Sequence, residues 1–533
     1  MSPGIFETWL GAFEDRLVRD WGGSRAKVLW DLLMTLLVWV RDLALNGAVY
    51  AVLRKLWRWG KDMVLSSRIG TLLRRHPREE AMYDSSLFCR LGDAVLAWMT
   101  RVARWIAWVL TFGRMDSWLI SRLRTLGKRL PWLDLSGLAG LCVLGILLVP
   151  GSLWHNEAGL VLAMALFGLY LLSAGLGRRE PLTVRVLGLP FLLFAFAAVM
   201  GVLAAYSRMQ ALRIFSFFLT AFLLYAALSG IIRDRKDLKK FLGCLYWAML
   251  LMGVAAVCQR IVGVEADPSL TDLANNAGMP GRVFSTFENP NNYAEAIVLL
   301  LPLCLSYCFM VEERKPRGRL LAGLLIPLLA LVMTYSRSSW VSFMLSVVLI
   351  VFLLDRRFLP ALPVLGFLAL PLLPSSVLNR ILTIGSTRDS SNAYRVHIWR
   401  SVLQLIRDHS VLGLGLGPEN FKPWFLQYSI RWTRPATHAH MLYLEIWVEM
   451  GILGILSYLL FYFSTLRRAA VRMGRAAGPL RLVLVTGFAA LGGISFVAAA
   501  EYIWYYPRVL LCYFILAGVL AAAVNIARRE EAQ

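Results

Sequence analysis

The feature that most constrains this chain is a series of long apolar runs that contain almost no charged residues. From Asp134 to the C-terminus these runs follow one another, separated by short polar segments. A helix of about 20 apolar residues spans the hydrocarbon core of a bilayer and satisfies its own backbone hydrogen bonds there. The runs therefore predict an all-α, polytopic membrane protein. We expect about twelve spans, at 135–150, 158–176, 184–205, 210–232, 239–264, 291–311, 319–335, 338–354, 358–374, 441–466, 480–499 and 506–527.

The composition agrees with membrane insertion. Hydrophobic residues make up 58% of the chain and charged residues only 17%. In a soluble protein the net charge of +23 would suggest nucleic acid, but in a membrane protein it fits loops that face anionic lipid. The seven cysteines are scattered and form no CxxC pair, which favours helix packing over a disulfide or metal site. We therefore expect the lipid bilayer, and no nucleic acid, as a partner.

Lysine and arginine are distributed unequally between alternate loops. One set of loops contains "GRREP", "RDRKDLKK", "EERKPRGR", "DRR" and "RRAAVRMGRAAGPLR". Basic loops stay on the cytoplasmic side, so the pattern predicts a cytoplasmic (inner or plasma) membrane protein with both termini inside the cell. The two longest loops, 265–290 and 375–440, then lie on the outer face. Long loops in compact proteins are usually functional, and apolar residues at helical spacing predict a helix within "SNAYRVHIWRSVLQLIRDHS".

Residues 1–130 differ from the rest, because Trp and Arg are interleaved in runs too short to span a membrane. In "AVLAWMTRVARWIAWVLTF" the apolar face is interrupted by Arg101 and Arg104. Such segments are typical of amphipathic helices on a membrane surface. We predict two domains: a basic amphipathic extension at 1–130, and a transmembrane domain at 131–533. The extension would contact lipid or envelope-assembly partners at the inner face.

Several arginines lie where the orientation rule predicts few. Arg208 and Arg213 flank the start of the fourth span, Arg282 precedes the sixth, and Arg337 lies in the turn "TYSRSSW". The guanidinium group matches phosphate oxygens, so phosphate binding would explain these positions. Pairing with a local carboxylate, or reaching to lipid headgroups, is the alternative for each of them.

The stretch "RPATHAHMLYLEIWVE" places two of the six histidines, His438 and His440, at the entrance of the tenth span. We expect their rings to point in different directions. A general base needs one imidazole near an acceptor hydroxyl, and the absence of HExxH argues against metal. A loop residue without a chemical role is the alternative, more so for His438. Glu445 and Glu449 lie within the span, where charge is costly, and we expect mainly structural pairing there.

The run "ENPNN" predicts a turn that feeds a capped helix. Asn289 and Asn291 flank Pro290, which favours the first helical turn. A helix N-terminus that faces a polar pocket also favours an anion. Simple capping explains the asparagines equally well.

Together these motifs resemble the O-antigen ligase and O-antigen polymerase superfamily. Four stretches carry the resemblance in matching order: "GRVFSTFENPNNYAEAIVLLLPL", "TYSRSSWVSF", "YRVHIWRSVLQLIRDHSVLGLGLGPENF" and "HAHMLYLEIWVEMGILG". The resemblance covers roughly residues 135–527 and is strongest over 280–455. Met441 departs from it, since an asparagine would be expected after the second histidine.

The resemblance implies a GT-C-like fold with its active site on the outer face. It implies a glycan donor on a polyprenyl diphosphate, a glycan or lipid acceptor, and no nucleotide sugar, metal or cofactor. His440 then looks like the base, with His438 beside it. The diphosphate clamp would comprise Arg337 foremost, then Arg208 or Arg213, with Arg282 and Arg395 as weaker candidates.

The implied activity is that of a metal-independent, inverting glycosyltransferase. Polymerase and ligase branches share these motifs, so the acceptor stays open. The alternative is a transporter of a small anion such as bicarbonate, which predicts paired ionisable groups near the bilayer midplane and internal repeats. Most candidate groups cluster at the outer ends of spans, with Glu449 the deepest exception, and this favours the enzyme.

Overall fold

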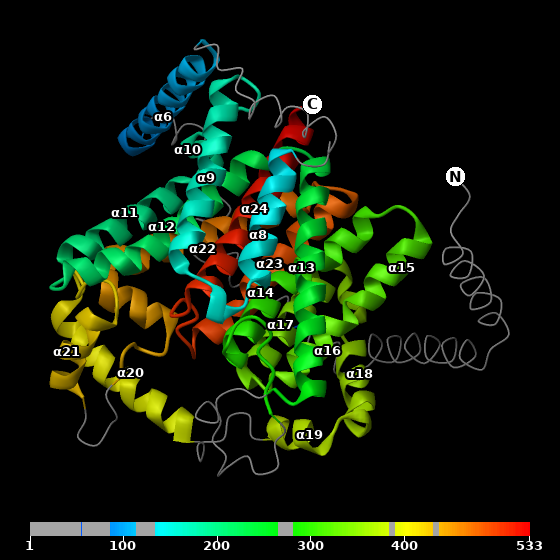
Figure 1. Cartoon of the computed structure of the whole chain (residues 1–533). Coiled ribbons are helices and arrows are strands. Elements are labelled where there is room, and N and C mark those ends of the chain that lie inside the picture. The colour runs from blue at the N-terminus through cyan, green and yellow to red at the C-terminus, as the bar shows by residue number, and fades with distance from the viewer. Residues whose placement is uncertain (1–54, 56–85, 113–133, 265–280, 383–389, 430–435) are drawn as a thin grey trace. The chain divides into compact units, whose positions relative to one another are not determined.

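The structure is a computed structural model, and it describes residues 55, 86–112, 134–264, 281–382, 390–429 and 436–533. In this part of the chain every regular element is a helix, in agreement with the predicted all-α class (Figure 1). Nine of the described helices are long and apolar enough to cross a membrane. Two shorter apolar helices add to them, Leu135–Leu148 and Leu189–Ala204. The chain is therefore a multi-pass membrane protein.

The helices follow the order of the predicted spans. They are α6 (Leu87–Phe112), α8 (Leu135–Leu148), α9 (Asn156–Gly175), α10 (Val184–Leu187), α11 (Leu189–Ala204), α12 (Arg208–Ile231), α13 (Arg235–Val262), α14 (Pro290–Met310), α15 (Arg314–Gly323), α16 (Leu325–Met333), α17 (Arg337–Asp355), α18 (Ala361–Ala369), α19 (Ser375–Leu382), α20 (Ser390–His409), α21 (Pro418–Tyr428), α22 (Leu442–Met473), α23 (Gly478–Ala498) and α24 (Pro507–Ala532).

One predicted span is not formed. The segment 358–374 folds into the nine-residue helix α18 and a single 3-10 turn, Leu370–Leu372. Nine helical residues rise only about 14 Å, less than half of the ~30 Å hydrocarbon core. The segment contains four prolines, at positions 360, 363, 371 and 374, and proline removes helical hydrogen bonds. Apolar helices therefore match eleven of the twelve predicted spans, nine of them long and two shorter.

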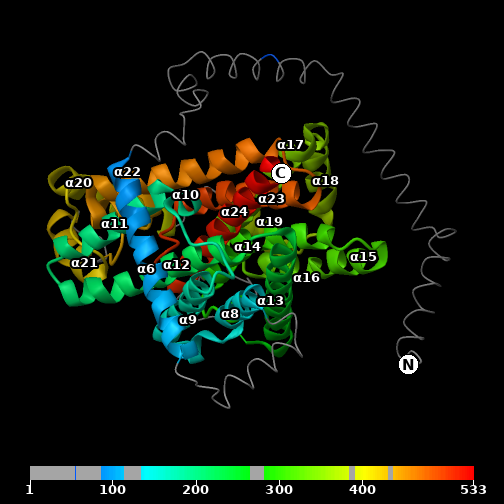
Figure 2. The ribbon, with the colours of Figure 1, turned by 90° about the horizontal axis from the view of Figure 1, so that it is seen from above.

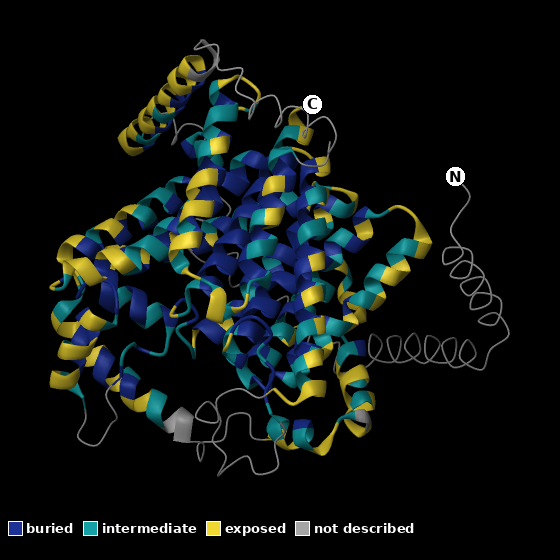
Figure 3. Cartoon of the chain, viewed as in Figure 1, coloured by how far each residue is buried: buried dark blue, intermediate teal, exposed yellow. Residues whose placement is uncertain are grey.

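Helix α24 forms the centre of the bundle. It packs against α12, α14, α22 and α23, and almost all of its residues are buried (Figure 3). A helix that is apolar on every side is expected in such a position. Around it lies an aromatic cluster contributed by α11, α12, α22, α24 and the segment before α24. The cluster comprises Phe191, Phe194, Phe218, Phe222, Tyr225, Phe461, Trp504 and Phe514.

Helix α6 is the longest described part of the predicted amphipathic extension at 1–130; residues 1–54, 56–85 and 113–130 lie outside the described residues. It packs across α9, α10 and α11 (Figure 2). A Cβ added to Gly175 of α9 would lie 2.8 Å from the backbone nitrogen of Arg104, so the two backbones touch. The Asp93 carboxylate also accepts a hydrogen bond of 2.7 Å from Val184 N. The opposite face exposes Trp98, Trp105 and Trp108, as expected of an amphipathic helix.

Two helices, α20 and α21, fold within the long loop that precedes α22. The helix predicted for "SNAYRVHIWRSVLQLIRDHS" is confirmed as α20. Both helices pack with α22 around a small apolar core. Its buried residues include Ile398, Val402, Leu405, Phe421, Phe425 and Val448. The two helices thus form a layer attached to the N-terminal part of α22.

Helix α22 is interrupted at Gly451, whose φ of +66° and ψ of −165° are not helical. The interruption exposes backbone groups that the preceding loop uses, an arrangement we call the Gly451 clasp. Its hydrogen bonds run from Leu414 N to Val448 O (2.7 Å), from Gly415 N to Glu449 O (3.0 Å) and from Ile452 N to Ser410 O (2.8 Å). The segment "GLGLG" is therefore fastened directly to a membrane-spanning helix.

Replacing Gly451 with alanine should destabilise the fold. A Cβ at this position would lie 2.1 Å from Val411 O, and the positive φ is itself unfavourable for alanine. Backbone strain and overpacking together should cost about 3 kcal/mol or more. Thermal unfolding in detergent should show a clearly lower Tm for Gly451→Ala.

The matched control is Gly474→Ala, at the C-terminal end of the same helix. Gly474 has a φ of −72°, and nothing lies within 4 Å of an added Cβ. Equal Tm values for the two variants would contradict the clasp.

Candidate active site

His438 and His440 lie in the short segment that immediately precedes α22. Their ring centroids are 4.0 Å apart, so the rings touch, and the expectation that they point in different directions is wrong. The cause is local: both residues precede the helix, and His440 has a φ of +49°. This left-handed conformation is uncommon for residues other than glycine, although histidine adopts it more readily than most. The two imidazole rings are therefore direct neighbours.

His438 is a weak base in this environment. Its ring stacks on Tyr505 at 4.4 Å, and its Nδ1 atom lies 3.1 Å from the hydroxyl oxygen of Thr437. Burial, together with the nearby His440 and Arg395, lowers the pKa of His438 to about 3. The imidazole is thus neutral at physiological pH and has little tendency to take up a proton.

His440 lies beside a carboxylate that the sequence did not single out. Its Nδ1 atom is 3.8 Å from Oε2 of Glu501, in the segment between α23 and α24. Glu501 also forms an ion pair with Arg395 of α20. Burial raises the pKa of Glu501, but Arg395 and His440 more than offset this effect and hold it below the ordinary value. Glu501 is therefore an ionised carboxylate between a histidine and an arginine.

Arg282 is the most deeply buried arginine of the site. Its Nε atom donates to Thr334 O at 2.7 Å, and Nη2 donates to the side-chain oxygen of Asn291. Burial, and then the neighbouring Arg380 and Arg337, lower the pKa of Arg282 to about 10, while Glu501 opposes the shift. Arg337, Arg380 and Glu501 therefore lie near Arg282, and Glu501 in turn pairs with Arg395. We call Arg282, Arg337, Arg380 and Arg395 the arginine cluster.

The structure brings together only part of the predicted set of arginines. Arg282, Arg337 and Arg395 belong to the arginine cluster, with Arg380 of α19 as a member that the sequence did not reveal. Arg213 lies elsewhere, on a cavity described below. Arg208 is exposed at the start of α12 and is not among the residues that line this cavity.

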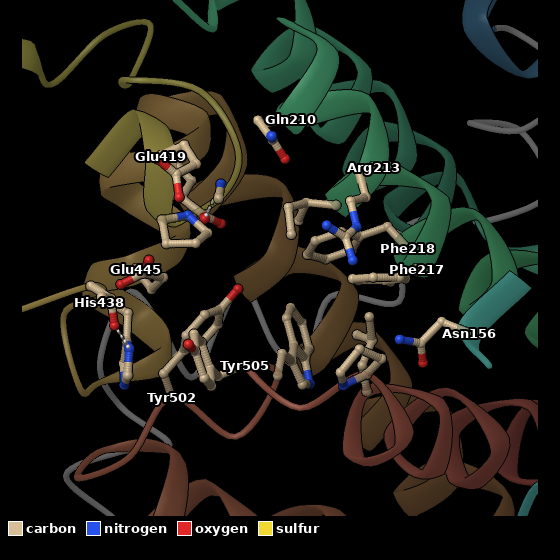
Figure 4. Close-up of a pocket in the computed structure, with 18 residues that line it drawn as sticks. Asn156, Gln210, Arg213, Phe217, Phe218, Glu419, His438, Glu445, Tyr502 and Tyr505 are labelled. Carbon is tan, nitrogen blue, oxygen red and sulfur yellow. Dashed lines mark hydrogen bonds between the residues drawn. The ribbon is translucent and has the colours of Figure 1, made fainter. Parts of the chain in front are cut away.

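A cavity of about 340 Å³ lies next to the histidine pair (Figure 4). In Figure 4, His438 and Glu445 lie on one side of it, and Arg213 and Asn156 lie on the opposite side. Its walls combine aromatic rings with hydrogen-bonding groups, and its volume falls within the range of small-molecule sites. Other residues that line it are Gln210, Phe217, Glu419, Thr437, Glu449, Tyr502, Trp504 and Tyr505.

Glu445 and Glu449 are both buried and both hold backbone amides, which is a structural role. Glu445 accepts a hydrogen bond from Ala439 N, between the two histidines. Met441 is the N-cap residue of α22 but has no side-chain group that can cap the helix, so this bond from the first turn fixes the histidine segment instead. Glu449 accepts from Gly417 N at 2.6 Å and so fixes the turn that begins α21.

The two asparagines have separate roles. Asn289 is the N-cap of α14, and its side chain accepts a hydrogen bond of 2.9 Å from Asn291 N, so the predicted cap is confirmed. Asn291 binds Arg282, a contact that the sequence did not predict. The start of α14 therefore also orients a member of the arginine cluster.

The low pKa of His438 makes stability depend on pH. The unfolded chain binds a proton at this histidine below about pH 6.5, whereas the folded protein does not. The contribution of His438 is therefore complete above that pH and is lost as the pH falls, by up to about 2 kcal/mol at pH 5. Between pH 7 and 5, Tm should fall less in His438→Asn than in the wild type. The exposed His397→Asn serves as the control and should keep the wild-type slope; parallel curves for all three proteins would contradict the prediction.

Part of the chain also matches a known protein family. Residues 322–459 match a family model described as O-antigen ligase, a range that holds Arg337, Arg380, Arg395 and both histidines of the pair. No curated protein matches the chain. Together with the multi-pass helical architecture, the O-antigen ligase domain at residues 322–459 supports membership of the chain in the O-antigen ligase and polymerase superfamily.

Proposed function

We propose that the chain transfers a glycan from a polyprenyl-diphosphate carrier to a glycan or lipid acceptor. The reaction would take place at the outer face of the cytoplasmic membrane, in the polymerisation or ligation of a cell-surface polysaccharide. One observation carries the proposal: the histidine pair connects the arginine cluster to the cavity. His440 lies beside Glu501, which binds Arg395, and His438 touches His440 while lining the cavity.

The arginine cluster is suited to the diphosphate of the donor. Guanidinium groups bind phosphate oxygens in a bidentate manner, and fixed cations stabilise the charge that grows on a departing diphosphate. Arg337 is the first residue of α17, and Arg282 is tied to the first turn of α14 through Asn291. The positive ends of both helices add to the attraction for an anion. The proposed reaction then needs no metal, because the arginines supply the positive charge.

His440 is suited to the role of general base. It would take the proton from the acceptor hydroxyl while the hydroxyl oxygen attacks the anomeric carbon. The bond from that carbon to the diphosphate oxygen breaks, and attack from the opposite face inverts the configuration. Glu501 would stabilise the imidazolium that forms, since it lies 3.8 Å from Nδ1. The low pKa of His438 makes it the weaker candidate.

The cavity is suited to the acceptor sugar. Sugar rings pack their C–H faces on aromatic rings, and Tyr502 and Tyr505 supply such surfaces. Gln210, Arg213 and Glu419 supply donors and acceptors for hydroxyl groups on the same cavity. The cavity suits an acceptor sugar attached to the same polyprenyl carrier as well as one attached to a different lipid. The proposal therefore covers both a polymerase and a ligase.

Loss of His440 should block transfer in cells. In cells that lack the protein, lipid-linked glycan should accumulate, and the wild-type protein should clear it. His440→Ala, at equal membrane abundance, should not, because loss of general-base assistance costs about 10²–10⁴-fold in rate. His397→Ala, at an exposed position of α20, is the matched control and should behave as the wild type. Clearance by His440→Ala would remove it as the base, and no accumulation in the deletion would favour the transporter interpretation.

Substitutions on the two sides of the histidine pair should affect different substrates. In a purified transfer reaction, Arg337→Gln should raise the KM for the lipid-linked donor about tenfold, as expected for a lost charged hydrogen bond. Tyr505→Ala should instead raise the KM for the acceptor. Arg407→Gln, at an exposed position of α20, controls for the general loss of a positive charge. If both substitutions moved the same KM, the division into donor and acceptor sides would be wrong.

A further inference from the structure

Glu501 lies between Arg395 and His440. In the proposed reaction Arg395 binds the donor diphosphate and His440 acts on the acceptor. Its Oε1 atom pairs with Arg395, and its Oε2 atom lies 3.8 Å from His440 Nδ1. All three side chains are largely shielded, with exposed fractions of 17% for Glu501, 20% for Arg395 and 24% for His440. If one member of such a shielded ion pair loses its partner, bulk water compensates its charge only poorly, and this costs free energy.

The surroundings of Glu501 and His440 are strongly charged. Arg282 attracts Glu501 from the segment before α14, and Glu295 of α14 repels it from within the bundle. Arg337 and Arg380 lie near Arg282. The His440 ring also faces Tyr394 of α20 and His438 of its own segment. Every arginine named here favours the ionised carboxylate, and any anion that enters the cluster competes with Glu501 for them.

The geometry shows which of its two partners Glu501 contacts more closely. A separation of 3.8 Å between Nδ1 and Oε2 is longer than a hydrogen bond, whereas the contact with Arg395 is a close ion pair. A movement of about 1 Å would bring Oε2 to hydrogen-bonding distance from Nδ1. A side-chain rotation supplies such a movement without a change of the backbone.

We propose that Glu501 changes partner when the donor binds: the diphosphate takes over Arg395, and the released carboxylate hydrogen-bonds to His440 Nδ1. This inference rests on the proposed function. With Nδ1–H donating to Glu501, Nε2 is left with its lone pair to accept the proton of the acceptor hydroxyl. Glu501 is thus a positioning residue, and it makes the base effective only when the donor is in place.

The tautomer of His440 is the direct readout of this exchange. We would record magic-angle-spinning spectra of ¹⁵N-histidine-labelled protein in lipid at pH 8, with the His440 signal assigned from His440→Gln. The probe is farnesyl diphosphate, and ³¹P line broadening reports whether it binds. In the wild type, the probe should convert His440 to the Nδ1–H tautomer. The same probe should leave the tautomer unchanged in Glu501→Gln.

Two further variants sharpen the test. Arg395→Gln frees Glu501 without any ligand, so it should show the Nδ1–H tautomer before the probe is added. Glu530→Gln removes a carboxylate that pairs with Arg235 at the other end of α24, and it should respond to the probe as the wild type does. Binding of the probe without a change of tautomer in the wild type would overturn the exchange.

Failure of the proposed function gives a different result. If farnesyl diphosphate does not bind to the wild type, the donor site is wrong, and an exchange driven by the donor is wrong with it. Arg395→Gln still tests whether Arg395 holds Glu501 away from His440. If the His440 tautomer in this variant is the same as in the wild type, Arg395 does not restrain Glu501.

Kinetics give an independent readout of the same exchange. Glu501→Gln should lower kcat about tenfold or more, because the base loses its orienting carboxylate. It should not raise the donor KM, because the carboxylate of Glu501 no longer competes with the diphosphate for Arg395. A substitution that merely disturbed the fold would worsen both parameters, and that outcome would contradict the role assigned to Glu501.

Discussion

Backbone groups close to the hydrocarbon core must find partners within the protein, and the interruption of α22 at Gly451 is arranged around this requirement. The carbonyl groups near the break accept amides from the "GLGLG" segment instead of remaining unpaired. This clasp fixes the ordered loop layer of α20 and α21 to the bundle. It also fixes Gly417, whose amide binds Glu449, and thereby one wall of the cavity. The position of the cavity therefore depends on a break in a membrane helix.

Charge is the second constraint. Arginines collected in a shielded site repel one another, so the site is stable only with anions among them. Glu501 supplies negative charge to Arg395 and Arg282. A bound diphosphate would supply more negative charge to the same arginines. The positive charge that Glu501 balances in the fold is thus the same charge that would attract the proposed donor, and this links stability to the proposed chemistry.

The sequence predicted the elements whose signal is local. Apolar runs predicted eleven apolar helical segments at the right places. The helical spacing of apolar residues predicted α20, and the run "ENPNN" predicted the Asn289 cap. It failed at 358–374, where apolar composition suggested a span but four prolines broke the helix. It also missed Arg380 and Glu501, because what makes them notable is proximity to residues more than forty positions away. The only sequence signal for Glu501 was its position in "EYIWYYPR", directly before the last predicted span.

The clasp also has a consequence for how the chain is made. Residues 390–428 leave the ribosome before α22 does, yet their fastening points, Val448 O and Glu449 O, belong to that later helix. The loop layer can therefore complete its hydrogen bonds only after α22 has been synthesised and inserted. Assembly of the site thus requires α22, and a chain that stalls before Gly451 lacks the clasp that attaches the loop layer to that helix.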